Sequence, residues 1–289
     1  MNSFIHKIEN LLCYFCFSII ITFPIFQILS RSIDFFSIPA SQAIIQHMTL
    51  WIAFIGAVLA ARSNRLLAIV REPIFDRTSN LSSNFRMNRF VAHGISVGVV
   101  LSLAISYLKM IQIGIDYPDF ITPFIPVWFA QSIIPIGLLL IYFHMILNSS
   151  SDRNYQKELM IFSFLFLFIT NIIPFPFSNT ITLILGVVAV LASVAYGLPI
   201  FIVLAALSII FFLSEPTEWA TNFDLMATIS DSGYRIVVSP TLAAIPIFTL
   251  AGYILAESNI SKRLLDFFKN SLGWLPGSTV LIVVLLCAF

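Results

Sequence analysis

Two cysteines and four histidines are the residues whose types and spacing could hold a metal or carry redox chemistry. Cys13 and Cys16 form a C-x-x-C pair, a spacing used by zinc sites and thiol oxidoreductases. Both lie inside an apolar run without a second pair, which favours packing on a membrane helix over a redox or metal site. The histidines are scattered and are expected to be interfacial or packing residues: His6, His47, His93 and His144. We therefore predict no catalytic, cofactor-binding or metal-binding residue.

Longer motifs that carry chemistry are also missing from the sequence. It contains no G-x-x-x-x-G-K-[ST] stretch for binding ATP phosphates and no H-E-x-x-H stretch for a zinc protease. Few ionisable residues lie in the middle of the apolar runs, so no proton relay or voltage-sensing stripe is visible. The sequence does not predict an enzyme.

The composition predicts an all-α integral membrane protein. Apolar residues make up 59% of the 289 residues and charged residues only 10%, too few to cover a soluble surface. Eight apolar runs approach the ~20 residues that a spanning helix needs, and a ninth begins near Thr279. They cover residues 11–29, 44–61, 90–108, 124–147, 159–173, 180–195, 198–213 and 241–256. We expect about eight to nine transmembrane helices, the first being retained rather than cleaved as a signal peptide.

The distribution of positive charge predicts the topology. The loop 62–89 carries six arginines and belongs in the cytoplasm by the positive-inside rule. Eight crossings then place the N-terminus, the loop 148–158 and the stretch 257–270 on the same side. Twelve of the fifteen Lys and Arg residues lie inside, and the three outside are Arg31, Lys109 and Arg235. We therefore predict a cytoplasmic N-terminus.

Small residues and amphipathic stretches predict how some helices pack. Gly94, Gly98, Ser102 and Ser106 recur at every fourth position and form one helix face for close packing. The second run has a small set that could be the partner face, at Ala53, Gly56, Ala57 and Ala60. Part of the outer loop 214–239 has apolar residues at helical spacing and could lie along the membrane surface. The stretch 261–272 is expected to be a short interfacial helix.

Prolines interrupt several of the apolar runs. Each removes a backbone hydrogen bond, and in transporters such breaks can line binding sites. Ordinary kinks are the better interpretation for each of them: Pro24, Pro126, Pro135 and Pro246. Pro199 is expected in the first turn of a helix that follows a tight turn.

The second part of the sequence resembles the start of the large, M-type membrane subunit of tripartite ATP-independent periplasmic (TRAP) transporters. The residues that carry the resemblance are YGLPI at 196–200, AIPIF at 244–248 followed by AG at 251–252, ISKRL at 260–264 and GWLPG at 273–277. Ser278 stands where the family usually has a second glycine.

The first part resembles the small, four-helix Q-type subunit of the same system. QILSR at 27–31 and WIAFIGA at 51–57 followed by AAR at 60–62 carry this likeness. Gln42 and Gln46 stand near positions where the family often has carboxylates. We predict a Q-type domain at 1–150, a linker with one extra transmembrane helix at 151–179, and the N-terminal part of an M-type permease domain at 180–289.

The resemblance implies a secondary transporter of the bacterial inner (cytoplasmic) membrane. It implies uptake of organic anions such as carboxylates, coupling to Na⁺ with no other cofactor, and a periplasmic solute-binding protein as partner. It also implies an elevator-like moving domain, with the Q-type helices bracing the fixed scaffold. No nucleic-acid partner is expected.

The resemblance also implies that the sodium and substrate ligands lie mostly beyond residue 289. We therefore expect residues 1–289 alone to insert without transporting. The alternative to a transporter component is a non-transporting membrane scaffold or decayed fragment of such a permease, and an intramembrane enzyme is a third class without a catalytic cluster to support it.

The predicted topology can be tested by cysteine labelling from the periplasm. Ser79→Cys lies in the arginine-rich loop and should not react, whereas Ser232→Cys in the outer loop should react. Labelling of both positions by a membrane-impermeant reagent would refute the topology.

Overall fold

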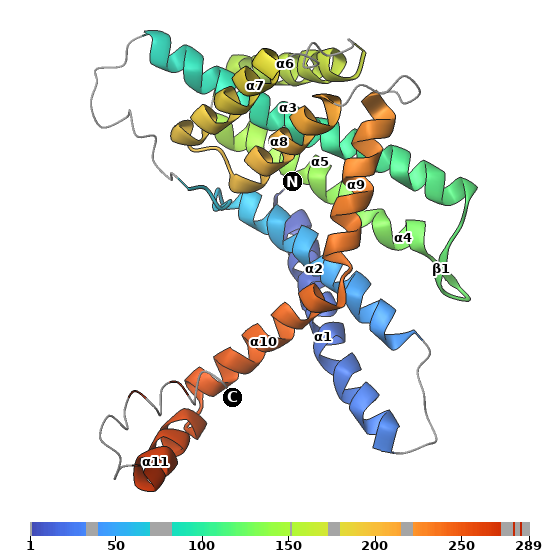
Figure 1. The fold of residues 1–289 in the computed structure, drawn as a ribbon, viewed down its shortest axis with the longest axis vertical. Coiled ribbons are helices and arrows are strands. Elements are labelled where there is room, and N and C mark those ends of the chain that lie inside the picture. The colour runs from blue at the N-terminus through green and yellow to red at the C-terminus, as the bar shows by residue number, and fades with distance from the viewer. Residues whose placement is uncertain are drawn as a thin grey trace. The chain divides into compact units, whose positions relative to one another are not determined.

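The computed structural model is almost entirely helical (Figure 1) and describes residues 2–32, 40–69, 83–150, 152–172, 180–214 and 222–272, with 280 and 284. It divides by contacts into two compact units, Met1–Ser239 and Pro240–Phe289. The α-helices of the first unit are α1 (Asn2–Ser32), α2 (Ser41–Arg62), α3 (Ser83–Asp116), α4 (Val127–Gln131), α5 (Ile133–Ser149), α6 (Arg153–Ile172), α7 (Thr180–Ser193), α8 (Ile200–Ser214) and α9 (Asn222–Val237). The second unit contains α10 (Pro240–Glu257) and α11 (Ile260–Leu272).

Helices dominate because a chain in lipid must satisfy its backbone polar groups internally. Within the described residues, five helices are long and apolar enough to cross a membrane: Glu9–Leu29, Ser41–Arg62, Phe90–Asp116, Val127–Ser149 and Pro240–Glu257. Two shorter apolar helices, at Leu183–Tyr196 and Ile200–Phe212, coincide with the sixth and seventh predicted runs. The fifth run forms α6, which is not among these candidates. The all-α membrane class is confirmed, and the number of crossings stays a prediction.

The predicted run 124–147 is not one helix. A two-stranded antiparallel hairpin, β1 (Phe120–Thr122) and β2 (Ile125–Pro126), comes first and is followed by the short α4 and then α5. Pro126 occupies the N-cap of α4, and Pro135 is the third residue of α5. Neither position requires an intrahelical N–H bond, so these two prolines shape helix starts. Pro24 and Pro246 do lie inside helices, in α1 and α10.

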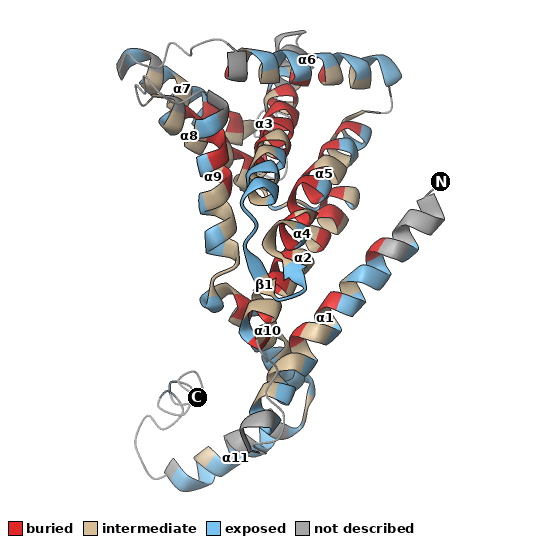
Figure 2. Cartoon of the chain, turned by 90° about the vertical axis from the view of Figure 1, so that its right-hand side faces the viewer, coloured by how far each residue is buried: buried red, intermediate tan, exposed pale blue. Residues whose placement is uncertain are grey.

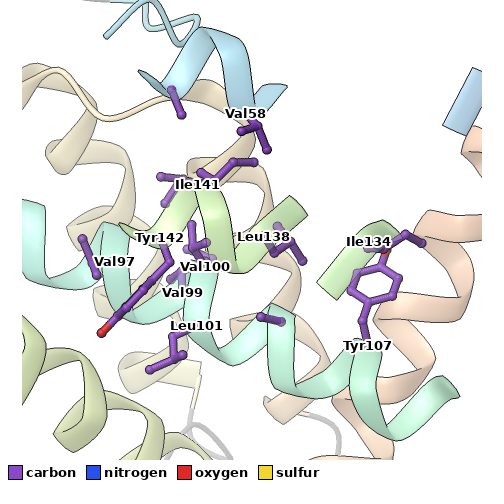
Figure 3. Close-up of a cluster of buried hydrophobic side chains, with 14 of the residues drawn as sticks. Val58, Val97, Val99, Val100, Leu101, Tyr107, Ile134, Leu138, Ile141 and Tyr142 are labelled. Atoms are coloured by element: carbon purple, nitrogen blue, oxygen red, sulfur yellow. The ribbon is translucent and has the colours of Figure 1, made fainter. Parts of the chain in front are cut away.

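Helix α3 is central to the first unit, and it packs against α5, α6 and α9. Figure 2 shows that buried residues are concentrated in α3 and α5. The side chains that pack between these two helices are drawn in Figure 3, including Val97, Val100, Leu101 and Tyr107 of α3 and Ile134, Leu138, Ile141 and Tyr142 of α5. Helix α2 reaches the same core through Val58, and its Phe54 packs over Gly137 of α5, where an added Cβ would lie 3.0 Å from the ring.

The small-residue face of α3 packs closely, as predicted, but its partner is α6 and not α2. A Cβ added at Gly94 would lie 2.5 Å from the ring of Phe162, and one at Gly98 would lie 2.7 Å from the ring of Phe166. A Cβ at Gly56, on the expected partner face, would meet no atom within 4 Å. Helix α6 follows the Q-like residues 1–150, which include α2, so the expected pairing with the small residues of α2 is wrong. Bulky aromatic rings, rather than a second small face, fill the space.

Other contacts hold α6 to α5 and to α3. The Tyr142 hydroxyl on α5 lies 3.0 Å from Ser163 Oγ, and both side chains are buried. Phe90 stacks edge-on against Tyr155 and Phe162, with ring centroids 5.4 and 5.9 Å apart.

Two further expectations concern α9 and α8. The apolar residues of the outer loop do form a helix, α9, but Met226 and Ala227 are buried in the protein. Helix α9 packs on α3 and α8, which corrects the expectation that it lies along the membrane surface. Trp219, one of the apolar residues at helical spacing in that loop, lies outside the described residues. Pro199 was expected in the first turn of the next helix. It instead lies directly before α8, and its carbonyl accepts hydrogen bonds from the N–H groups of Ile202 and Val203.

The second unit consists, in its described part, of two consecutive helices. Helix α10 contains Pro246 and coincides with the predicted apolar run 241–256. Helix α11 confirms the helix expected at 261–272, and its charged residues Lys262, Arg263, Asp266 and Lys269 are exposed.

Enlarging Gly98 should destabilise the first unit. Gly98→Leu places atoms where the Phe166 ring lies, and overpacking of this kind costs roughly 1–3 kcal/mol. We expect a lower melting temperature in detergent and a lower yield. Gly56→Leu is the matched control, since that position is also helical and has open space around it. Equal melting temperatures for the two variants would contradict the packing of α6 on α3.

Candidate functional site

The candidate site is a seam between two groups of helices of the first unit. We define the seam as the contacts between two groups of elements. One group is α7, α8 and α9 with the turn 196–199 between α7 and α8; the other is α2 and α3 with the residues 63–69 that follow α2. Helix α3 contacts both α8 and α9, and α2 contacts α9. Polar interactions cluster near the two ends of the seam, and apolar side chains pack between them.

At one end, the residues after α2 pair with the turn between α7 and α8. Ala68 and Pro199 form an antiparallel β-bridge, and the N–H of Ile200 donates to the Leu67 carbonyl at 2.9 Å. Gly197 adopts φ 85°, a left-handed conformation that glycine reaches without strain. The chain can therefore reverse direction tightly at this turn, and the backbone of the turn pairs with Leu67 and Ala68, which follow α2.

A cavity of about 440 Å³ opens beside this bridge. The ends of α2 and α5, the first half of α3 and the α7–α8 turn all contribute to its walls. His93, Ser96, Asn148 and Tyr196 supply side-chain polar groups. Elements far apart in sequence meet at this point.

Charged and amide groups fix the helix ends near this cavity. Arg62, at the end of α2, is ion-paired with Glu9 of α1, whose side chain is buried. His144 Nε2 on α5 lies 3.9 Å from the other Glu9 oxygen. The Asn148 side chain donates to the Ala61 carbonyl at 2.8 Å and so satisfies one of the last carbonyls of α2.

Near the other end, a buried histidine on α2 bonds to α9. His47 Nδ1 lies 2.7 Å from the Ala43 carbonyl, which can only accept, so Nδ1 carries the proton of the neutral ring. Nε2 then accepts from the Tyr234 hydroxyl at 2.8 Å. Gln131 is a further polar neighbour of that hydroxyl. This bond joins residues 187 positions apart.

An ion pair and a close contact with α3 extend this connection along α9. Lys109, near the end of α3, is paired with Asp224 of α9. A Cβ added at Gly233 would lie 2.9 Å from the Tyr107 hydroxyl, so α9 approaches α3 closely there. Arg235 is paired with Asp231 within α9 at 2.7 Å.

The two ends of the seam agree with the sorting of charges in the sequence. The bridge end contains the residues after Arg62, the turn at 196–199 and Asn148, which the predicted topology places in the cytoplasm. The opposite end contains Lys109 and Arg235, two of the three cations assigned outside. The topology itself stays a prediction.

The structure places most of the residues considered in the sequence. Cys16 is buried in the core and Cys13 is half-buried, consistent with packing. His93 lines the cavity, and the side chain of His6 lies outside the described part. Gln42 is exposed and Gln46 half-buried. The bond between His47 and Tyr234 and the burial of Glu9 were not predicted, and Glu9 at the start of an apolar run was the signal for the second.

The seam is suited to holding helices together. Its polar contacts are hydrogen bonds and ion pairs between different helices, supported by the apolar core. In the described ranges, no three His, Cys, Asp or Glu side chains gather as a metal ion would need. What the geometry can do is fix α8 and α9 against α2 and α3.

Its fold defines the class: the chain is a multi-pass α-helical membrane protein. Comparison with family models gives two matches along it, the DctQ component of tripartite ATP-independent periplasmic transporters at residues 20–153 and the DctM component at residues 186–289. No curated protein matches the chain. The chain belongs to the TRAP transporter permeases, with Q and M components in one polypeptide. Helix α6 lies between the two matched regions, and the seam joins one match to the other.

Removing the Tyr234 hydroxyl should weaken the seam. Tyr234→Phe leaves His47 Nε2 without this donor, and interhelical hydrogen bonds in membrane proteins contribute about 0.6 and at most about 1.7 kcal/mol. We expect a small fall in the melting temperature in detergent. Tyr253→Phe, on the exposed face of α10, is the control and should be neutral. Equal stability of the two variants would contradict the assigned bond.

Proposed function

We propose that this chain is the membrane component of a sodium-coupled TRAP transporter that takes up organic anions, carboxylates in particular. The observation that carries the proposal is the occurrence of the Q and M matches in one chain, in that order. The proposed partner is a solute-binding protein in the periplasm, which delivers the anion. The proposed location is the bacterial inner membrane, with the N-terminus in the cytoplasm and Na⁺ as the coupling ion rather than a cofactor.

The seam supports a specific role for the Q-like helices within this function. A transporter that moves one domain past another needs a second domain that does not move. The polar contacts near both ends of the seam, and the buried apolar side chains between them, resist sliding of α8 and α9 along α3. We propose that α2, α3, α5 and α6 form a brace that keeps these first M-type helices fixed.

The role of α6 follows from its packing. The rings of Phe162 and Phe166 occupy the glycine face of α3, so α6 forms part of the same brace. A crossing here would also return the chain to the correct side for the M-type part. We propose that α6 both sets that orientation and extends the brace.

Uptake in cells tests the proposed function. The complete gene that encodes this chain would be expressed with its binding-protein gene in a bacterium lacking its own carboxylate uptake. A panel of radiolabelled carboxylates, including dicarboxylates and sialic acids, would serve as substrates. We expect accumulation of at least one of them that needs both genes and a sodium gradient.

Two controls separate this proposal from other kinds of uptake. Removal of the binding-protein gene should abolish accumulation, and replacement of sodium by potassium should do the same. Accumulation that continues without the binding protein, or without sodium, would refute the proposed mechanism. Absence of accumulation with every substrate of the panel would favour a non-transporting scaffold.

A further inference from the structure

The hairpin formed by β1 and β2 connects two apolar spans, Phe90–Asp116 and Val127–Ser149. Phe120 pairs with Pro126, and the Val127 N–H donates to the Asp119 carbonyl at 2.8 Å, which closes the base of the hairpin. Only Tyr117, Pro118 and Asp119 separate the end of the first span from β1. The hairpin is therefore confined to the boundary of the membrane.

One part of the hairpin packs on the protein. Ile121 and Ile125 line a small apolar cavity of about 90 Å³ together with Ile44, Met48 and Trp51 of α2. The Trp51 indole N–H donates to the Ala130 carbonyl at 3.0 Å, which holds α4 beside α2. These contacts fix the direction of the hairpin relative to the helices.

The opposite part of the hairpin exposes large aromatic side chains. Phe124, at the turn, is 92% exposed, and Phe120 is exposed as well. Tyr117, just before β1, is also exposed. No Asp, Glu, Lys or Arg occurs from Phe120 to Ser151. The charged residues next to the hairpin are Asp119, at its base, and Asp116, at the end of α3. Exposed phenylalanines are costly in water, whereas Phe, like Trp and Leu, forms the apolar faces of segments that lie in the membrane interface.

The dimensions fit a position within the lipid headgroup layer. Headgroups add roughly 5–7 Å to each side of the hydrocarbon core. A strand rises about 3.3 Å per residue, so arms of two or three residues extend roughly 7–10 Å. The tip therefore remains within the headgroup layer when the hairpin is tilted toward the membrane surface.

We propose that the hairpin anchors the protein in the membrane interface, with Phe120 and Phe124 inserted among the lipid headgroups and upper acyl chains. The anchor sets the depth of the end of α3 and of α4. It thereby holds the His47–Tyr234 end of the seam near the membrane boundary. The partner of this surface is lipid, and a docking protein is the competing outcome of the test.

Spin labelling of the full chain in phosphatidylcholine–phosphatidylglycerol vesicles tests the proposal. A label at Phe124→Cys, in a background with the three native cysteines replaced, is compared with labels at Ile136→Cys and Ser232→Cys. Ile136 is exposed on the apolar span, and Ser232 is exposed on α9. Collisions with oxygen report lipid, and collisions with a water-soluble nickel chelate report water.

The label at residue 124 should collide with oxygen more, and with the nickel chelate less, than the label at residue 232. A label at Phe120→Cys should become more accessible to nickel when Phe124→Asp is added and should not change with Phe124→Trp. Nickel accessibility at 124 equal to that at 232 would overturn the anchor. Immobilisation of the label by added solute-binding protein, together with high nickel accessibility before its addition, would assign the hairpin to protein docking instead.

Discussion

The close approach of α6 to α3 is the constraint on which the first unit depends. Gly94 and Gly98 leave a face of α3 without side chains, and the rings of Phe162 and Phe166 occupy it. With α6 on this face, the other faces of α3 remain available for α5, α8 and α9. Lipid offers no hydrophobic drive for helices to associate, so contact must come from shape and from polar bonds. The glycine face supplies the shape, and the seam supplies the bonds.

These bonds are distributed in a way that suits a fixed connection. The backbone bridge between Ala68 and Pro199 lies near one end of the seam, and the His47–Tyr234 and Lys109–Asp224 pairs lie near the other. A single attachment would allow α8 and α9 to pivot. Attachments near both ends, with buried apolar side chains between them, oppose both pivoting and sliding. This is the physical basis for assigning the Q-like helices a bracing role.

The membrane class, most helices and the family could be predicted from the sequence, because apolar runs and local motifs are local signals. Which helix packs against which could not be predicted in the same way. The glycine face of α3 correctly indicated tight packing, but nothing in its spacing distinguishes α6 from α2 as the partner. The apolar stripe of α9 looked suitable for a membrane surface because a stripe does not reveal whether protein or lipid covers it. Pro126 and Pro135 were visible, yet only the hairpin between the spans explains why the apolar run divides into α4 and α5. The bond between His47 and Tyr234 joins two residues with no local relation.

A disulfide across the bridge end of the seam tests the bracing role most directly. Residues paired in a β-bridge have Cα atoms about 4.5–5.5 Å apart, which suits a disulfide. Ala68→Cys with Pro199→Cys, in a background without other cysteines, should therefore cross-link under mild oxidation in native membranes. If α8 is part of a fixed scaffold, sodium-driven uptake by the complete transporter should be the same before and after cross-linking. Uptake that stops on oxidation and returns on reduction would show that the seam moves during transport and would contradict the account.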